Sequence, residues 1–195
     1  MRLWYYFFYI LGLRREELVP LQYKDINLDE KYILINKAVT FQKNQPVIKK
    51  TKNEEIRKVP IFDILYDKLK KLKSIHKLNE YIFPNTLNKM MSETCLKRKL
   101  SYVLKNINAD LKNDTQKSVS INACTEQEIE YEETKFTLHQ LRHTYACILY
   151  KAGIDIKQAQ LWMGHKDIKI LLGIYTHLDS QDNAKSIEKV NQFLA

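Results

Sequence analysis

The sequence predicts an α+β fold that is mostly α-helical, with a small antiparallel β-sheet or hairpin on one side. Two observations predict it. Apolar residues recur at helical spacing in several segments, and after Thr137 the chain has a helical pattern almost to its end. Short runs rich in β-branched residues are confined to residues 32–59, where turn-forming residues separate them. We expect one domain over residues 1–195.

The first third of the chain supplies the predicted sheet. Residues 3–11 are expected to form a buried helix rich in Tyr and Phe, which Gly12 ends, and residues 14–18 begin a second short helix. Three β-rich runs are expected as strands: residues 32–35, 46–48 and 56–59. The last two would form a hairpin with Lys52 in the turn at its tip.

The rest of the chain is expected to be helical apart from one excursion. Residues 63–77 carry apolar residues at helical spacing, and Ser92 suits the N-cap of a helix that runs to about Asn106. Residues 107–134 are rich in Asn, Asp, Ser and Thr and are expected to be irregular. Four helices are expected after them: residues 138–151, 156–163, 168–175 and 180–194.

The basic composition fits a nucleic-acid partner or an acidic surface, and the composition argues against several other classes of protein. The formal net charge is +9 and the sequence pI is about 9.3. The three cysteines form no Cys-x-x-Cys pair, which argues against a disulfide framework or a zinc site and favours the reducing cytoplasm. The apolar run at residues 3–13 is too short to span a bilayer, and no targeting segment is visible.

Residues that can carry chemistry gather near the end of the chain. His139 and Arg142 are three residues apart, so on a helix they lie on one face. His165 follows Gly164, and Tyr175 comes about three helical turns later. This group suits the attack of a phenol oxygen on a phosphodiester, because a histidine can take the phenol proton and cations can hold the phosphate.

These residues, together with others earlier in the chain, resemble the tyrosine recombinase family, also called phage integrases. The segments that carry the resemblance occur in the family's order along nearly the whole chain. They are LGLRREEL at 11–18, TKN at 51–53, RKVP at 57–60, HQLRHT at 139–144, LWMGH at 161–165 and IYTH at 174–177. The resemblance implies the family's helical catalytic domain and a DNA strand-exchange enzyme that uses neither ATP nor a metal nor another cofactor.

The resemblance also implies roles for individual residues. The implied catalytic residues are Arg14, Lys52, His139, Arg142, His165 and Tyr175. Arg14 and Arg142 would clamp the scissile phosphate, and Tyr175 would form a 3′-phosphotyrosyl link. His139 would accept the phenol proton or support the phosphate, and His165 would donate a hydrogen bond to a non-bridging oxygen. Lys52 would protonate the leaving 5′ oxygen.

Some of these assignments have competitors in the sequence. Lys49 and Lys50 compete with Lys52 for the general acid. Glu17, three residues after Arg14, would orient an arginine or a histidine, although a local ion pair at the start of a helix explains it nearly as well. His143 is expected to be structural, because a histidine on a helix is more often structural than catalytic.

The expected partners are double-stranded DNA and further copies of the chain. The resemblance implies a synaptic tetramer on DNA, with the helix at 180–194 available to dock on a neighbouring protomer; an ordinary end helix packed on its own core is the alternative. The N-terminal core-binding domain usual in the family is not expected, because Arg14 lies almost at the start. Two other functions stay open: a non-catalytic DNA-binding remnant of a mobile element, and a relaxing enzyme similar to type IB topoisomerases.

Overall fold

The computed structural model describes residues 3–50, 56–121, 134–165 and 167–179, and within them it confirms the α+β class. The helices are α1 (Leu3–Tyr9), α2 (Arg15–Leu18), α3 (Asp63–Ile75), α4 (Glu93–Ile121), α5 (Leu138–Lys151), α6 (Ile156–Met163) and α7 (Ile168–Asp179), with a 3-10 turn η1 at Tyr23–Asp25. The strands are β1 (Ile26–Asn27), β2 (Tyr32–Ile35), β3 (Lys37–Gln42), β4 (Gln45–Lys50) and β5 (Arg57–Pro60). None of the described helices has the length and apolar character needed to cross a bilayer.

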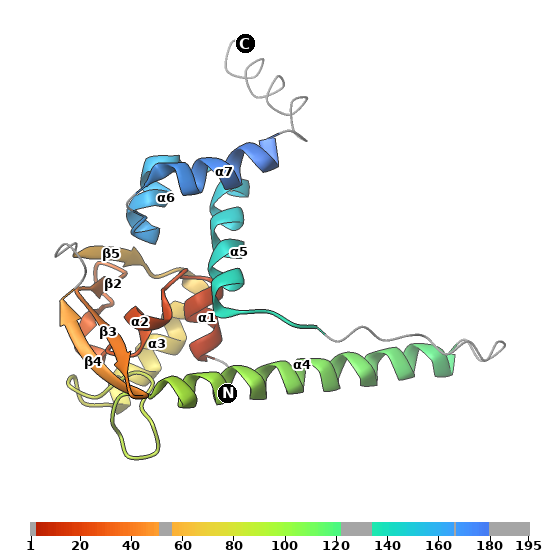
Figure 1. The fold of residues 1–195 in the computed structure, drawn as a ribbon, viewed down its shortest axis with the longest axis horizontal. Coiled ribbons are helices and arrows are strands. Elements are labelled where there is room, and N and C mark those ends of the chain that lie inside the picture. The colour runs from red at the N-terminus through yellow and green to blue at the C-terminus, as the bar shows by residue number, and fades with distance from the viewer. Residues whose placement is uncertain (1–2, 51–55, 122–133, 166, 180–195) are drawn as a thin grey trace, which may run out of the picture.

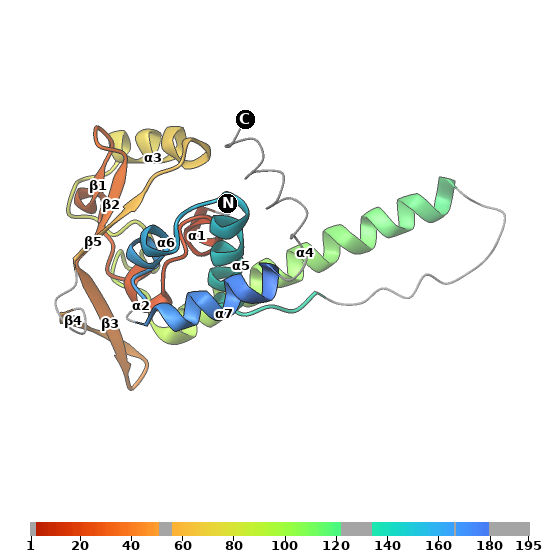
Figure 2. The same ribbon diagram turned by 90° about the horizontal axis from the view of Figure 1, so that it is seen from above.

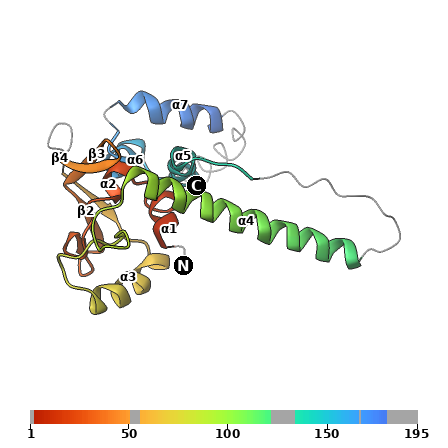
Figure 3. The ribbon, with the colours of Figure 1, turned by 60° about the horizontal axis from the view of Figure 1, so that its bottom comes forward.

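The elements form two groups that meet at α1. The strands lie together at one end of the molecule, while α5, α6 and α7 form a helical group beside α1 (Figure 1). Helices α3 and α7 lie on opposite sides of the molecule (Figure 3). Contacts of α5 with α1, and of α6 with β5, join the helical group to the rest.

The predicted hairpin between residues 46–48 and 56–59 is wrong. The two segments are strands, but β4 pairs with β3, and β5 pairs with β2 in a separate three-stranded sheet of order β1-β2-β5. The β3–β4 hairpin turns at Lys43 and Asn44, which both have positive φ, as a tight two-residue turn requires. It projects away from the other strands (Figure 2).

Helix α4 is much longer than the sequence predicted. The expected end near Asn106 is wrong, because the helix continues to Ile121 through part of the segment expected to be irregular. Its first half packs on the core through Leu100, Val103 and Ile107, which continue the helical spacing of Leu96. The later turns extend beyond the body of the molecule (Figure 1).

Aromatic residues of α1 build the main core, as the sequence predicted for this segment. Trp4, Phe7 and Phe8 are buried, and the Phe7 ring meets that of Phe83 edge-on with centroids 4.9 Å apart. Burial of this much aromatic surface stabilises the fold strongly. The helix ends at Tyr9, and the chain passes through Leu11 and Gly12 to the start of α2.

Gly12 is required by both its backbone and its neighbour. Its φ of +59° is in the left-handed region, and a Cβ at this position would overlap Cδ1 of Tyr145 on α5. The Gly12 carbonyl also accepts a hydrogen bond from Arg142. The close approach at Gly12 therefore sets the distance between α5 and the loop that carries Arg14.

We predict that Gly12→Ala lowers the free energy of unfolding by about 2–4 kcal/mol, because it adds backbone strain and an overlap with the Tyr145 ring. Gly173→Ala is the matched control. Gly173 lies within α7 with open space around its Cα, so alanine should stabilise by about 0.5–1 kcal/mol. Urea unfolding of both variants measures this. A Gly12→Ala protein as stable as the wild type would contradict the packing described.

Candidate active site

The start of α5 presents His139 and Arg142 because the helix is firmly capped. Thr137 Oγ1 accepts from the backbone N–H of Gln140 at 3.2 Å, and the Gln140 side chain accepts from the backbone N–H of Thr137 at 2.7 Å. This capping box fixes where the helix begins. His139 therefore lies exposed in the first turn, and Arg142 one turn later points into the molecule.

Four of the predicted site residues line one pocket of about 420 Å³. They are Arg14, His139, Arg142 and His165. The pocket lies between the loop before α2, the start of α5 and the segment that joins α6 to α7. Residues separated by up to 151 positions in sequence thus meet at one place.

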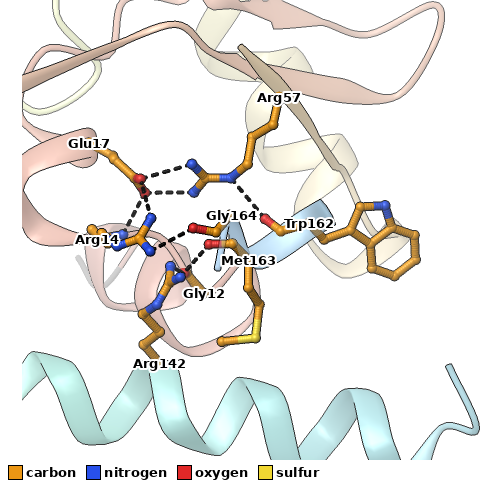
Figure 4. A network of polar contacts seen from close by, with 8 residues as sticks. All are labelled: Gly12, Arg14, Glu17, Arg57, Arg142, Trp162, Met163 and Gly164. Carbon is orange, nitrogen blue, oxygen red and sulfur yellow. Dashed lines mark hydrogen bonds and ion pairs between the residues drawn. The ribbon is translucent and has the colours of Figure 1, made fainter. Parts of the chain in front are cut away.

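The C-terminal turn of α6 is held by three arginines, one for each of three successive carbonyl groups (Figure 4). Arg57 Nε donates to the Trp162 carbonyl at 3.0 Å, Arg142 Nη2 donates to Met163, and Arg14 Nη2 donates to Gly164 at 2.7 Å. Carbonyls at the end of a helix lack partners within the helix and attract cations. The turn that precedes His165 is therefore fixed from three sides.

Gly164 makes this arrangement possible. Its φ of +63° closes α6 in the left-handed conformation that favours glycine. A Cβ at position 164 would lie 2.8 Å from Nη1 of Arg57, so a larger residue would push the Arg57 guanidinium away from the turn. The glycine before His165 is thus explained by close packing as well as by the backbone.

Glu17 is the buried carboxylate that balances these arginines. It is 4% exposed, and both its oxygens bind Arg57, at 2.8 and 2.7 Å. It also accepts from Arg14 Nη1 at 2.9 Å and from the Arg14 backbone N–H at 2.8 Å. Burial alone would raise the pKa of Glu17, but the hydrogen bonds and charges of Arg57 and Arg14 outweigh it and lower the pKa to about 2.

The guanidinium of Arg142 is the most deeply buried cation of the site. Arg142 is 4% exposed, and it donates to the carbonyls of Gly12 and Met163. Burial and the charges of Arg14 and Arg57 lower its pKa to about 9, against the opposing effect of Glu17, so it is still protonated at neutral pH. Glu17 pairs with Arg14 and Arg57 but not with Arg142, so these three guanidinium groups leave an excess of positive charge beside the pocket.

His165 is neutral at physiological pH in this state. Its burial and the charges of Arg142, Arg14 and Arg57 lower its pKa to about 4. Its Nδ1 is buried and has no hydrogen-bond partner among the described residues. A neutral imidazole has one nitrogen that donates and one that accepts, so His165 can offer a hydrogen bond to an anion in the pocket.

Tyr175 does not lie in the pocket. It is 8% exposed and packs in the core between α5, α6 and α7, where its ring meets that of Tyr150 with centroids 4.9 Å apart. Its hydroxyl is buried with no hydrogen-bond partner among the described residues. Burial raises the pKa of Tyr175, and Asp155 and Cys147 raise it further. The neighbouring Ile174 lines the pocket in its place.

The lysine of the predicted site lies outside the described residues. Lys52, the expected general acid, belongs to the segment 51–55 between β4 and β5. Of its competitors, Lys49 lies exposed on β4 and does not line the pocket. Because β4 and β5 belong to different sheets, the segment with Lys52 connects two sheets instead of closing one hairpin.

Two residues near the pocket were missed by the sequence analysis. Arg57 was noted only as part of a motif, yet it binds both Glu17 and the end of α6. The sequence did contain a signal for this role. Side chains of a strand alternate between its two faces, so Arg57 lies on the same face as Val59, which is buried. His143, expected to be structural, lines the pocket. Among the described residues, no group of three His, Cys, Asp or Glu side chains is placed to hold a metal ion.

Comparisons with known proteins agree with the sequence motifs. The family model described as "Phage integrase family" matches residues 1–182. The chain is 28% identical over 206 residues to a "Tyrosine recombinase XerC-like" protein of Caldanaerobacter subterraneus subsp. tengcongensis, across 92% of this chain and 46% of the relative. It is 27% identical over 188 residues to the ICEBs1 integrase of Bacillus subtilis, across 95% of this chain and 47% of the relative.

The fold is also similar to that of solved structures. The Tn1549 transposon integrase in complex with transposon right end DNA superposes with a TM-score of 0.69 at 21% identity, across 94% of this chain and 56% of that chain. At this level of identity the likeness concerns the fold. The chain spans about half the length of the curated relatives that it matches.

We predict that Glu17 makes stability depend on pH in the acid range. Its folded-state pKa of about 2 lies below the ordinary value of 4.5, so the carboxylate stabilises the fold above about pH 4.5, and this is lost as the pH falls towards 2. The contribution should be roughly 3 kcal/mol. Urea unfolding across this range should show a slope that Glu17→Gln lacks. The control is Glu30→Gln, at an exposed ion pair with Lys58. An unchanged slope in Glu17→Gln would contradict the pairing.

We predict that an anion in the pocket raises the pKa of His165. The cations that lower this pKa in the free protein would be partly neutralised by inorganic phosphate, so the imidazole would take up a proton more readily. Titration of the histidine side chains by NMR, with and without phosphate, measures the change. His76, which is exposed and paired with Glu80, serves as the internal control. A His165 titration that phosphate does not move would argue against anion binding here.

Proposed function

The chain belongs to the phage integrase family, and from this membership and the pocket we propose that it is the catalytic part of a site-specific DNA recombinase. Its substrate is double-stranded DNA, and its reaction is the breaking and rejoining of strands through a covalent link to Tyr175. The observation that carries the proposal is the convergence of two arginines and two histidines on one pocket, beside an excess of positive charge.

The pocket suits a phosphodiester for two physical reasons. A guanidinium group presents several N–H donors in one plane, which matches the oxygens of a phosphate, and Arg14 keeps 38% of its side chain exposed for this contact. Negative charge grows on the non-bridging oxygens as the pentacoordinate transition state forms. Cations that are already fixed, as Arg14 and Arg142 are by carbonyl groups, stabilise that charge without having to reorganise.

The proposed reaction has two steps, each of which exchanges one phosphorus–oxygen bond for another. Tyr175 Oη attacks the phosphorus, forming a 3′-phosphotyrosyl link, and the bond to the 5′ oxygen breaks. The phenol proton passes to His139, and Lys52 protonates the leaving 5′ oxygen, while His165 donates to a non-bridging oxygen. The 5′ hydroxyl of a partner strand then attacks the link and releases Tyr175. Each bond is replaced by one of the same kind, so ATP is not consumed.

The proposed attack requires α7 to move. Successive residues on an α-helix point about 100° apart, so a rotation of that size about the helix axis would exchange Ile174 for Tyr175 at the pocket. Gly173, directly before Ile174, lowers the intrinsic stability of α7 and would ease a local unwinding. In this proposal, the described state is one in which Tyr175 is withdrawn from the pocket.

The burial of Tyr175 also favours the second candidate function, a DNA-binding remnant that does not cut. In such a protein the phenol would stay in the core with DNA bound. The two candidates differ in whether a covalent adduct forms. A relaxing enzyme similar to type IB topoisomerases would form the adduct too, but on DNA of any sequence, so a requirement for the element's own ends separates it from a recombinase.

The proposed partners include further copies of the chain. We assign to residues 180–194, which lie outside the described residues, a role in docking on a neighbouring protomer when a tetramer assembles on DNA. Their sequence contains the apolar residues Ile187, Val190, Phe193 and Leu194. Cross-linking on DNA, with and without these residues, tests this assignment.

We predict that Tyr175→Phe abolishes the covalent protein–DNA adduct and leaves DNA affinity within about threefold, because only the nucleophilic oxygen is removed. The substrate is nicked DNA from the ends of the element, and the adduct is measured as a slow-migrating band on a denaturing gel. Tyr145→Phe is the control, since its hydroxyl is also buried without a partner among the described residues. An adduct that survives Tyr175→Phe would contradict the assignment. Binding without any adduct in the wild type would favour the remnant.

We predict that DNA binding depends strongly on salt. The positive charge of the chain would contact mainly phosphates, so each contact releases counterions, and the affinity should fall at least about tenfold between 50 and 200 mM salt. Fluorescence anisotropy with labelled DNA measures the dissociation constant at each concentration. An affinity that does not change over this range would argue against binding through phosphates.

A further inference from the structure

We infer that Arg57 is a positioning residue for the proposed cleavage: it ties Glu17 to the C-terminal turn of α6 and so sets where Arg14 and His165 stand in the pocket. This inference rests on the proposed function and adds to it a residue outside the six to which a catalytic role was assigned. Arg57 does not line the pocket, so it acts through its neighbours.

The contacts of Arg57 use all three nitrogens of its guanidinium group. Nη1 and Nη2 each bind one oxygen of Glu17, at 2.8 and 2.7 Å, and Nε binds the Trp162 carbonyl at 3.0 Å. The side chain is only 11% exposed. A planar, two-pronged group is needed to meet two carboxylate oxygens on one edge and a carbonyl near its stem. A lysine would keep the charge but not these directions.

One arm of this arrangement reaches the pocket through Glu17. The same carboxylate that pairs with Arg57 also binds the side chain and the backbone N–H of Arg14. Without Arg57, Glu17 would keep a buried charge with only one ionic partner among the groups described. Its position, and with it the direction of the Arg14 guanidinium, would then be less well determined.

The other arm reaches the pocket through the end of α6. Arg57 holds the Trp162 carbonyl and packs against Gly164, where a Cβ would meet its guanidinium group. His165 is the next residue along the chain, and it lines the pocket. Figure 4 shows Arg57 between Glu17 and Trp162, on the side of the turn opposite Arg142. A single side chain on β5 thus links two of the groups that would contact the phosphate.

A simple ion pair for stability is the alternative role. Such a pair can often be replaced by other groups with little effect on function, and its loss affects folding alone. The loss of a positioning residue would also lower the reaction rate of the folded protein, because small displacements of groups that contact a transition state can slow a reaction about a hundredfold. The two roles are therefore separable by rates measured on folded protein.

The first experiment compares Arg57→Gln, Arg57→Lys and the control Lys58→Gln, whose exposed side chain on the same strand pairs with Glu30. Adduct formation on nicked DNA is followed at saturating protein, well below the melting temperature of each variant, and DNA affinity is measured separately. We expect both Arg57 variants to slow adduct formation about 10- to 100-fold, with dissociation constants within about threefold of the wild type. Lys58→Gln should behave as the wild type. A wild-type rate in Arg57→Lys, or a loss confined to affinity, would overturn the inference.

The second experiment needs no activity and so separates this inference from the proposed function. Glu17 faces Arg14 and Arg57, with Arg142 and His165 nearby, and Arg57 is the largest influence that lowers its pKa. NMR titration of the Glu17 carboxyl group should show a higher pKa in Arg57→Gln, with altered chemical shifts at Gly164 and His165. The same signals should be unchanged in Lys58→Gln. If Arg57→Gln does not fold, Arg57→Lys serves in its place.

The combined outcomes are distinct. A wild type that forms no adduct would remove the proposed function, while altered Glu17 and His165 signals would still support the placement by Arg57. Unaltered signals in a folded Arg57 variant would overturn the inference whether or not the wild type cuts DNA.

Discussion

The end of helix α6 is the point on which the pocket depends. Three successive carbonyl groups there would lack partners within the helix, and each accepts from an arginine of a different element. The loop before α2, strand β5 and helix α5 are therefore joined at one turn. The arginines gain from the negative end of the helix dipole, but they repel one another at short range. The buried Glu17 reduces that repulsion, which explains why a carboxylate lies so close to a pocket with an excess of positive charge.

This constraint gives the pocket its chemical character. The guanidinium groups are fixed before any ligand arrives, and the lowered pKa values of Arg142 and His165 show that their surroundings already disfavour further positive charge. An anion relieves this cost. The site is thus better matched to a group that gains negative charge during reaction than to a neutral one. Because these positive charges repel one another, the pKa values of Arg142 and His165 should change with any change in the number of charges around the pocket.

The sequence predicted the local features of the fold well, because the signals were local. The first helix does end before Gly12, and the helices expected at residues 138–151 and 156–163 have those bounds in the structure. Strand pairing was predicted wrongly for two reasons. The sequence of a β-rich run does not show which other strand it pairs with. The Lys43–Asn44 turn also lacks the glycine typical of such hairpins.

The site was predictable in part for the same physical reasons. Arg14, Arg142, His139 and His165, which the sequence motifs grouped together, line one pocket in the structure, while their catalytic roles stay predictions. The length of α4 was underestimated, because the Asn, Asp, Ser and Thr residues of its second half are also typical of loops. The orientation of Tyr175 could not be predicted, since a helical pattern gives the faces of a helix but its rotation depends on packing with neighbouring helices.

The burial of Tyr175 has a consequence for the cell that houses such a protein. An enzyme of the proposed kind, which breaks DNA through its own side chain, could damage any DNA that it meets by chance. As the proposed nucleophile, Tyr175 would be unreactive in the described conformation, since its hydroxyl is buried and its pKa is raised. The described conformation of the proposed enzyme would therefore prevent strand cleavage during chance contacts with DNA. Strand breaks would form only in complexes that displace α7.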